Sequence, residues 1–143
     1  MAPPIPARVS LVTLGVADVE RSNAFNRALG WEPSSASVPG KVTFFPTQGG
    51  LLALWGRDAQ AADSGVPASP PGAVALAINV ESAAAVDDAL ARAREAGGRV
   101  SRAAATTDWG GYNGYFVDPD GHAWEIAHNP FWPIGPDGRP ELP

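Results

Sequence analysis

Apolar and polar positions along the chain form a series of strand-like and helix-like segments that occurs twice. Each half begins with an apolar, β-prone run, continues with a segment of helical spacing, and ends with strand-like runs around a tight turn. The first half contains residues 8–16, 17–30, 41–46 and 51–55; the second contains 73–80, 82–97, a short strand at 99–104 and a hairpin around 118–121. The repeated order predicts two related modules.

A segment rich in Ala, Ser, Gly and Pro lies between the two halves and is typical of a linker. We place the first module at residues 8–58, the linker at 59–72 and the second module at 73–130. An aromatic, Pro-rich tail follows at 131–143 and is expected to pack on something. A chain of 143 residues is long enough for two small modules around one core.

Both expected helices carry signals for where they begin and end. Asp18 and Ser82 stand at the starts, and both are residue types that accept hydrogen bonds from free backbone N–H groups. Gly30 and Gly97 stand at the ends, where glycine readily adopts a left-handed backbone. The sequence therefore predicts one capped helix in each module.

Composition excludes several classes of function. The net charge is −5 with no run of basic residues, so nucleic-acid binding is not expected. The absence of cysteine excludes disulfides, thiolate catalysis and Cys-ligated zinc. The N-terminal residues MAPPIPARVS have no signal-peptide pattern, and no apolar run approaches the ~18 residues of a membrane span. We expect a cytoplasmic protein that does not bind membranes.

The segment WGGYNGYFVDPDGHAWEIAHNP contains the most informative pattern. Asp118-Pro119-Asp120-Gly121 is a turn signal between apolar runs, which predicts a β-hairpin. One strand of this hairpin carries a single carboxylate, Glu125, between Trp124 and Ile126. A charged residue on an apolar strand usually has a partner or a function. In an apolar surrounding, Glu125 would be a candidate general acid or base.

With LVTLGVADVERSNAFNRALG near its start and YFVDPDGHAWEI near its end, the chain resembles the vicinal oxygen chelate superfamily. That group includes glyoxalase I, bleomycin-resistance proteins and extradiol dioxygenases, and the resemblance spans residues 8–130. It implies an α+β fold, in which two βαβββ modules form a curved mixed sheet around a cleft.

The resemblance also implies up to four metal-ligand positions, two in each module. They fall at Leu11, Ala53, Ala75 and Glu125, and only Glu125 can bind a metal ion. One carboxylate does not make a divalent-metal site, which commonly needs at least three protein ligands. We therefore expect no metal or other cofactor, as in the metal-free, bleomycin-resistance-like branch, with one divalent metal ion as the alternative.

The cleft face follows from strand alternation, if each hairpin pairs symmetrically about its turn. The expected pairs are Val42 with Trp55, Phe44 with Ala53, Gly114 with Glu125, and Phe116 with Ala123. This register turns Tyr115 and Trp124 toward the helices. It gives an apolar, aromatic-lined concavity with one carboxylate, which is typical of a small-molecule site.

Two further groups complete the expected site. Trp109 and Tyr112 lie in a Gly-rich loop that could cover the cleft, while Thr13 and Asn79 lie on neighbouring strands. The predicted ligand contacts are Thr13, Phe44, Trp55, Asn79, Trp109, Tyr112, Phe116 and Glu125.

Three functions remain open at this stage. The first is a non-catalytic protein that sequesters an aromatic metabolite or antibiotic. The second is a metal-independent isomerase or lyase with Glu125 as acid or base, helped by Thr13, Asn79 or Tyr112. The third is a divalent-metal glyoxalase or dioxygenase with displaced ligands. The resemblance also implies a homodimer, for which the apolar tail could supply an interface or a lid.

Overall fold

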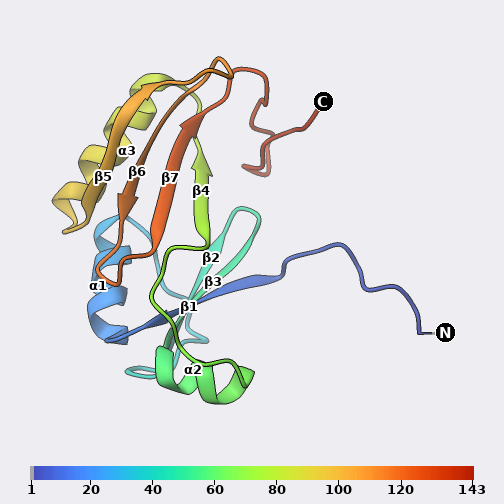
Figure 1. Cartoon of the computed structure of the whole chain (residues 1–143), viewed down its shortest axis with the longest axis vertical. Helices are drawn as coiled ribbons and strands as arrows, with labels where there is room; N and C mark the ends of the chain where they lie inside the picture. The colour runs from blue at the N-terminus through green and yellow to red at the C-terminus, as the bar shows by residue number, and fades with distance from the viewer. Residues whose placement is uncertain (1) are drawn as a thin grey trace.

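The computed structural model describes residues 2–143, which form two sheets with the two longer helices on one side (Figure 1). The first part of the chain contains β1 (Leu11–Val16), α1 (Val19–Ala28), β2 (Val42–Thr47), β3 (Gly50–Gly56) and α2 (Arg57–Ser64). The second part contains β4 (Ala75–Asn79), α3 (Ala83–Glu95), β5 (Arg99–Thr106), β6 (Tyr112–Val117) and β7 (Ala123–His128). The expected order of strands and helices is thus present in both halves.

The two sheets have related topologies. Sheet A has the strand order β1-β3-β2, and sheet B has the order β4-β7-β6-β5. In each sheet the first strand pairs in parallel with the last strand of its module, and the other pairs are antiparallel. This arrangement confirms the predicted α+β fold class. The first module has one strand fewer than βαβββ, because the segment before β2 contributes only an isolated bridge between Val38 and Val42.

Helix α2 occupies residues that we expected to belong to module end and linker. Its sequence RDAQAADS is rich in Ala, the strongest helix former, although the same composition also resembles a loop. The helix ends at Gly65, whose φ of +73° requires the left-handed backbone that glycine tolerates. The irregular linker is therefore shorter than the sequence suggested.

The predicted caps of the two longer helices are present. The Asp18 side chain accepts a hydrogen bond from the backbone N–H of Arg21 at 3.0 Å, and the Ser82 hydroxyl accepts one from Ala85 at 3.1 Å. Gly30 and Gly97 follow the helix ends with φ near +100°. The local signals in the sequence thus fix both helices before any tertiary contact is considered.

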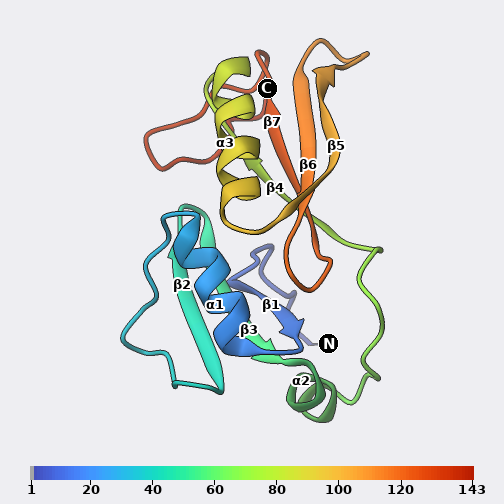
Figure 2. The same ribbon diagram turned by 90° about the vertical axis from the view of Figure 1, so that its left-hand side faces the viewer.

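One hydrophobic core connects the modules. Helices α1 and α3 lie in the same layer, one above the other (Figure 2). The core takes side chains from both sheets, including Phe45 and Leu54 of sheet A and Phe116 and Trp124 of sheet B. Trp31 joins the two groups, because its ring packs edge-on against both Phe45 and Trp124. The modules are therefore parts of one folding unit rather than separate domains.

The β6–β7 turn fastens the second module to the first. The Asp120 carboxylate accepts hydrogen bonds from the backbone N–H of Ala17 at 2.8 Å, the Ser22 hydroxyl at 2.6 Å and the Arg21 guanidinium at 3.0 Å. Asp118 has a local role, since its carboxylate accepts from the backbone of the turn and from the Trp124 indole. Asp120 is therefore more than the turn residue that the sequence suggested.

The outer edge of β1 is covered by side chains. The Gln60 amide of α2 donates to the carbonyl of Thr13 at 3.2 Å, and the His122 ring lies 3.0 Å from the carbonyl of Gly15. These contacts occupy backbone oxygens that no neighbouring strand reaches.

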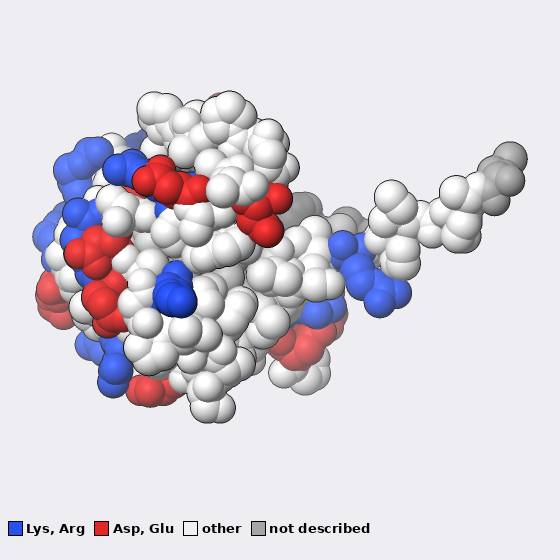
Figure 3. Space-filling model, turned by 90° about the horizontal axis from the view of Figure 1, so that it is seen from below, with Lys and Arg blue, Asp and Glu red and all other residues white. Residues whose placement is uncertain are grey.

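The N-terminal arm, residues 2–10, leaves the body of the molecule in an extended conformation (Figures 1 and 3). Its apolar side chains are exposed, with 92% of Ile5 and 72% of Val9 accessible to solvent. Within residues 2–143, no helix is long and apolar enough to cross a membrane.

Candidate functional site

The second hairpin has a register one residue away from the expected one. Tyr115 lies opposite Glu125, Phe116 opposite Trp124, and Gly114 opposite Ile126. The expected pairing was wrong because the loop between Val117 and Ala123 includes His122 as well as the four turn residues. A shift of one residue exchanges the two faces of a strand.

This shift changes which β6 side chains lie beside Glu125. Tyr115, which we expected to face the helices, lies next to Glu125 on the face of sheet B away from α3, which we call its open face. Phe116 points to the opposite side and is 2% exposed, with its ring stacked on Trp124 at a centroid distance of 6.0 Å. Phe116 is therefore a core residue, out of reach of a ligand on the open face. Trp124 is in the core, as expected.

Sheet A has the expected register, with Val42 opposite Trp55 and Phe44 opposite Ala53. Phe44 and Trp55 therefore share one face of that sheet, the face away from α1, which we call its open face. Neither of them lines the cavity that lies beside Glu125 and is described below. Thr13 is also separate from that cavity and borders a second one, between β1, α2 and the linker. The single cleft expected from the sequence is thus divided among different places.

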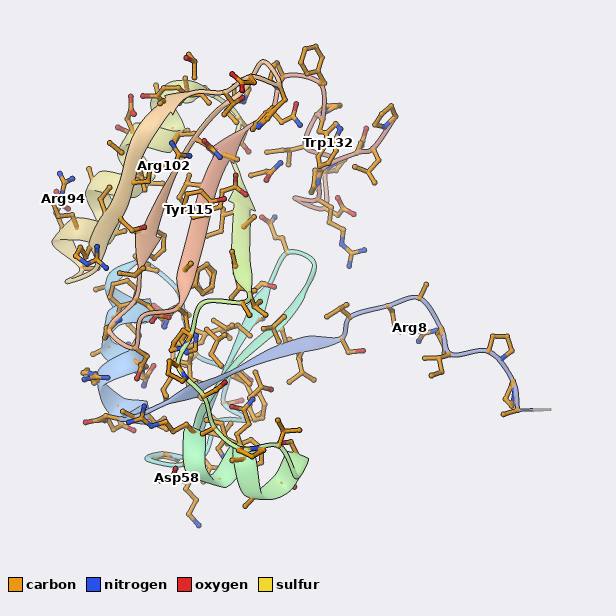
Figure 4. The ribbon with its side chains drawn as sticks, in the orientation of Figure 1. Arg8, Asp58, Arg94, Arg102, Tyr115 and Trp132 are labelled. Atoms are coloured by element: carbon orange, nitrogen blue, oxygen red, sulfur yellow. The ribbon has the colours of Figure 1, made fainter. Side chains whose placement is uncertain are left out.

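A cavity of about 470 Å³ lies beside Glu125 on the open face of sheet B. Its lining residues are Asn79, Trp109, Glu125, Ala127, Asn129, Phe131 and Trp132. The sheet supplies the carboxylate, the small side chain of Ala127 and the Asn79 amide, while loop and tail supply the aromatic rings. Figure 4 shows Trp132 on the tail, which lies to the right of the strands of sheet B.

The sequence predicted three of these residues, Asn79, Trp109 and Glu125, and missed the contribution of the tail. Phe131 and Trp132 come close to the sheet because Asn129 forms a turn: its side chain accepts from the N–H of Phe131, and its carbonyl accepts from that of Trp132. The signal was the aromatic pair in the tail, which we expected to act as a lid or an interface.

Loop and tail also contact each other. A Cβ placed on Gly110 would lie 3.0 Å from the ring of Phe131, and the φ of Gly110 is +93°. Glycine is therefore needed at this position both for backbone conformation and for the approach of the ring.

A row of hydrogen-bonded side chains crosses sheet B toward the cavity. The Arg102 guanidinium donates to Asn113 Oδ1, and Asn113 Nδ2 donates to Glu125 Oε2 at 2.6 Å. Arg102 also lies over the Tyr115 ring, 5.4 Å from its centroid, and Figure 4 shows both on neighbouring strands. Since Asn113 is 7% exposed and uses both ends of its amide, its orientation is fixed. One oxygen of the Glu125 carboxylate is therefore held in place.

Tyr112 lies away from the cavity, contrary to our expectation. It is on the helix side of β6, and its hydroxyl donates to Asp87 Oδ1 of α3 at 2.8 Å. This hydrogen bond, with smaller contributions from desolvation and the Asp87 charge, raises the pKa of Tyr112 above its ordinary value. Tyr112 therefore connects sheet B to a helix and does not assist Glu125.

The residues around Glu125 do not fit a divalent metal ion of the kind the family resemblance implies. Across the strands its neighbours are Ala77 and Tyr115. Within residues 2–143, no three His, Cys, Asp or Glu side chains are grouped as a metal site would need. The His128 ring is 3.2 Å from the carbonyl of Val80, and His122 is at the edge of β1.

Comparisons with known proteins agree with this fold. Residues 8–126 match the family model of the Glyoxalase/Bleomycin resistance protein/Dioxygenase superfamily. The structure is similar to that of a glyoxalase-related enzyme from Fulvimarina pelagi, with 39% identity, a TM-score of 0.88, and coverage of 96% of this chain and 99% of that one. No curated protein matches the chain.

Two other solved structures are similar over most of their length. A glyoxalase/bleomycin resistance protein/dioxygenase from Nocardioides has 29% identity and a TM-score of 0.71, covering 90% of this chain and 85% of that one. A lactoylglutathione lyase from Agrobacterium tumefaciens has 23% identity and a TM-score of 0.69, covering 87% of this chain and 95% of that one. At this identity, the similarity concerns the fold alone. The chain belongs to the glyoxalase/bleomycin resistance/dioxygenase superfamily.

Proposed function

We propose that this protein binds an aromatic small molecule, a metabolite or an antibiotic, in the cavity beside Glu125. The observation that carries the proposal is that one carboxylate and three aromatic residues, Trp109, Phe131 and Trp132, line the same open cavity. The volume of about 470 Å³ lies within the usual range for small-molecule sites. Flat rings stack on Trp and Phe, which favours an aromatic ligand.

The exposure of these rings supports a binding role. Trp109 is 46% exposed, Phe131 66% and Trp132 39%. Large apolar side chains that gather at a cavity commonly mark a surface that binds something. A ligand held between loop and tail would remove them from water and gain the corresponding hydrophobic free energy.

Native mass spectrometry of the protein purified without chelator tests the proposal first. We expect the spectrum to show an organic adduct that contains an aromatic ring. If the protein is purified without a ligand, we expect aromatic compounds from a panel to bind it, and Trp fluorescence measures this binding. The variant Trp109→Leu should weaken binding about 10-fold, because it removes a stacking partner. Trp55→Leu is the control, since Trp55 does not line this cavity. Because Trp55 lies on the open face of sheet A, the mass of this variant is compared with that of the wild type by light scattering. Unchanged binding by Trp109→Leu would contradict the proposal.

A metal-independent isomerase or lyase is a second candidate, favoured by one observation. Asn79 lines the same cavity as Glu125 and could bind a substrate oxygen while Glu125 moves a proton. Thr13 and Tyr112, the other expected helpers, lie elsewhere. Turnover of a bound compound that Glu125→Gln abolishes, with binding retained, would support this candidate.

We also propose that the protein forms a homodimer through the open face of sheet A. Leu11 and Leu51 are paired neighbours on this face, 43% and 44% exposed, and the arm adds Ile5 and Val9. An apolar surface of this kind fits a second copy of the chain. Light scattering should give about twice 14.8 kDa, and Leu51→Lys should yield monomers. A wild-type monomer would contradict this assignment.

A further inference from the structure

Glu125 is a partly buried carboxylate without a cation. Within residues 2–143, its carboxylate accepts a hydrogen bond from the Asn113 amide at Oε2. The ion pairs found among residues 2–143 join Arg21 to Asp120 and Arg139 to Asp137, so neither includes Glu125. A carboxylate in partly apolar surroundings loses favourable hydration, and an opposite charge from another molecule would compensate for the loss.

Arg102 does not supply this charge. Its guanidinium donates to Asn113 Oδ1 and to the carbonyl of Ala103, and it lies over the Tyr115 ring. Asn113 stands between Arg102 and Glu125, so the two charges are linked only through a neutral amide. The row therefore holds the carboxylate in position without neutralising it, and leaves Oε1 for a partner.

The rest of the cavity favours a cation in the same way. Its lining contains Trp109, Phe131 and Trp132, whose ring faces attract positive charge, and Trp is the strongest of the aromatic residues in this respect. The remaining polar groups are the neutral amides of Asn79 and Asn129. The described lining includes no Lys, Arg or His, so an anionic ligand would find no opposite charge beside Glu125.

We propose that the ligand of this cavity is an aromatic compound with a positively charged nitrogen, which binds Glu125 Oε1 between the aromatic rings. This inference rests on the proposed function, because it specifies the chemical class of the ligand in the same cavity. A protonated amine satisfies the carboxylate by a charge-assisted hydrogen bond, while its ring stacks on Trp or Phe. A divalent metal ion fits less well, because Glu125 has no second metal-binding side chain beside it.

Three probes that differ in one substituent test the charge. These are 1-naphthylmethylamine, 1-naphthalenemethanol and 1-naphthoic acid, with binding to the full chain measured by calorimetry near neutral pH. We expect the amine to bind at least about 10-fold more tightly than the alcohol, and the acid to bind most weakly. The preference for the amine should decrease with added salt.

Glu125→Gln separates charge from shape, because glutamine keeps the size of the side chain and can still accept from Asn113. In this variant the amine should fall to the affinity of the alcohol, while the alcohol should bind as it does to the wild type. Glu95→Gln is the matched control, since Glu95 is exposed on α3 and the change in net charge is the same.

The outcomes distinguish this inference from the proposed function. Equal binding of amine and alcohol, or a preference for the amine that survives Glu125→Gln, would overturn the cationic ligand and leave aromatic binding in place. Binding of none of the three would overturn both. Loss of the preference for the amine in EDTA would show that a metal ion is involved, and would also overturn the inference.

Discussion

Removal of the Asp120 carboxylate tests whether the β6–β7 turn holds the two modules together. The change Asp120→Ala deletes an acceptor that is 6% exposed and serves Ala17, Arg21 and Ser22. The Arg21 side chain is 49% exposed, so its contribution is screened and is left out of the sum. The hydrogen bonds from Ala17 and Ser22 remain, each worth about 1.5 kcal/mol or more to a charged acceptor. The expected loss is therefore about 3 kcal/mol.

Urea unfolding followed by Trp fluorescence measures this loss directly. In a separate thermal unfolding experiment, a loss of about 3 kcal/mol corresponds to a decrease in Tm of roughly 10 °C for a chain of this size. Asp137→Ala is the matched control, because Asp137 meets Arg139 at 3.9 Å and both side chains are more than half exposed. The control should change stability by less than about 1 kcal/mol. If Asp120→Ala were as stable as Asp137→Ala, the turn would not be the fastening point described above.

Three other predictions follow from the packing of sheet B. Phe116→Ala should destabilise the protein by about 3–5 kcal/mol, because the side chain is 2% exposed, and aromatic ligands should bind the folded variant as before, which calorimetry can check. Gly114→Ala should lower the free energy of unfolding, measured in urea, by about 1–3 kcal/mol, because its Cβ would lie 2.6 Å from the Leu90 side chain and 2.9 Å from the backbone of β5. Gly56→Ala is the control, since its Cβ would meet nothing within 4 Å. The Tyr112 phenol should ionise at higher pH than a free tyrosine, and Asp87→Asn should lower its pKa, as measured by phenolate absorbance. Because the pKa of Tyr112 is raised in the folded state, the stability that its hydrogen bond contributes is present below the ordinary pKa of tyrosine and is lost as pH rises through the folded value.

The sequence predicted the fold well because the fold depends on local signals that repeat. The caps at Asp18 and Ser82 and the turn at 118–121 can each be recognised within a few residues. The first hairpin was placed correctly because its strands are joined by two residues, Gln48 and Gly49, so the pairs are symmetrical about the turn. Helix α2 is the exception among these local elements, because its Ala-rich sequence was interpreted as part of the linker.

The candidate site was harder to predict because it depends on counting and on tertiary contact. The inclusion of His122 in the second loop exchanged Phe116 for Tyr115 on the open face. Phe131 and Trp132 reach the cavity by a turn of the tail, and no periodicity in the chain indicates where a tail packs. Of the lining residues, sequence reasoning identified Asn79, Trp109 and Glu125. The parallel pairing of β4 with β7 places Asn79 and Glu125 on one face whatever the register of β6.

The covering of β1 has a consequence for how this protein can associate. An uncovered strand edge offers backbone groups to any other extended chain, and this is a common route to aggregation. Here Gln60 and His122 already occupy the carbonyls of Thr13 and Gly15. A neighbouring molecule therefore cannot extend sheet A by adding a strand that pairs with these two carbonyls. A partner that binds at this edge instead meets side chains, whose shape and polarity can distinguish one partner from another.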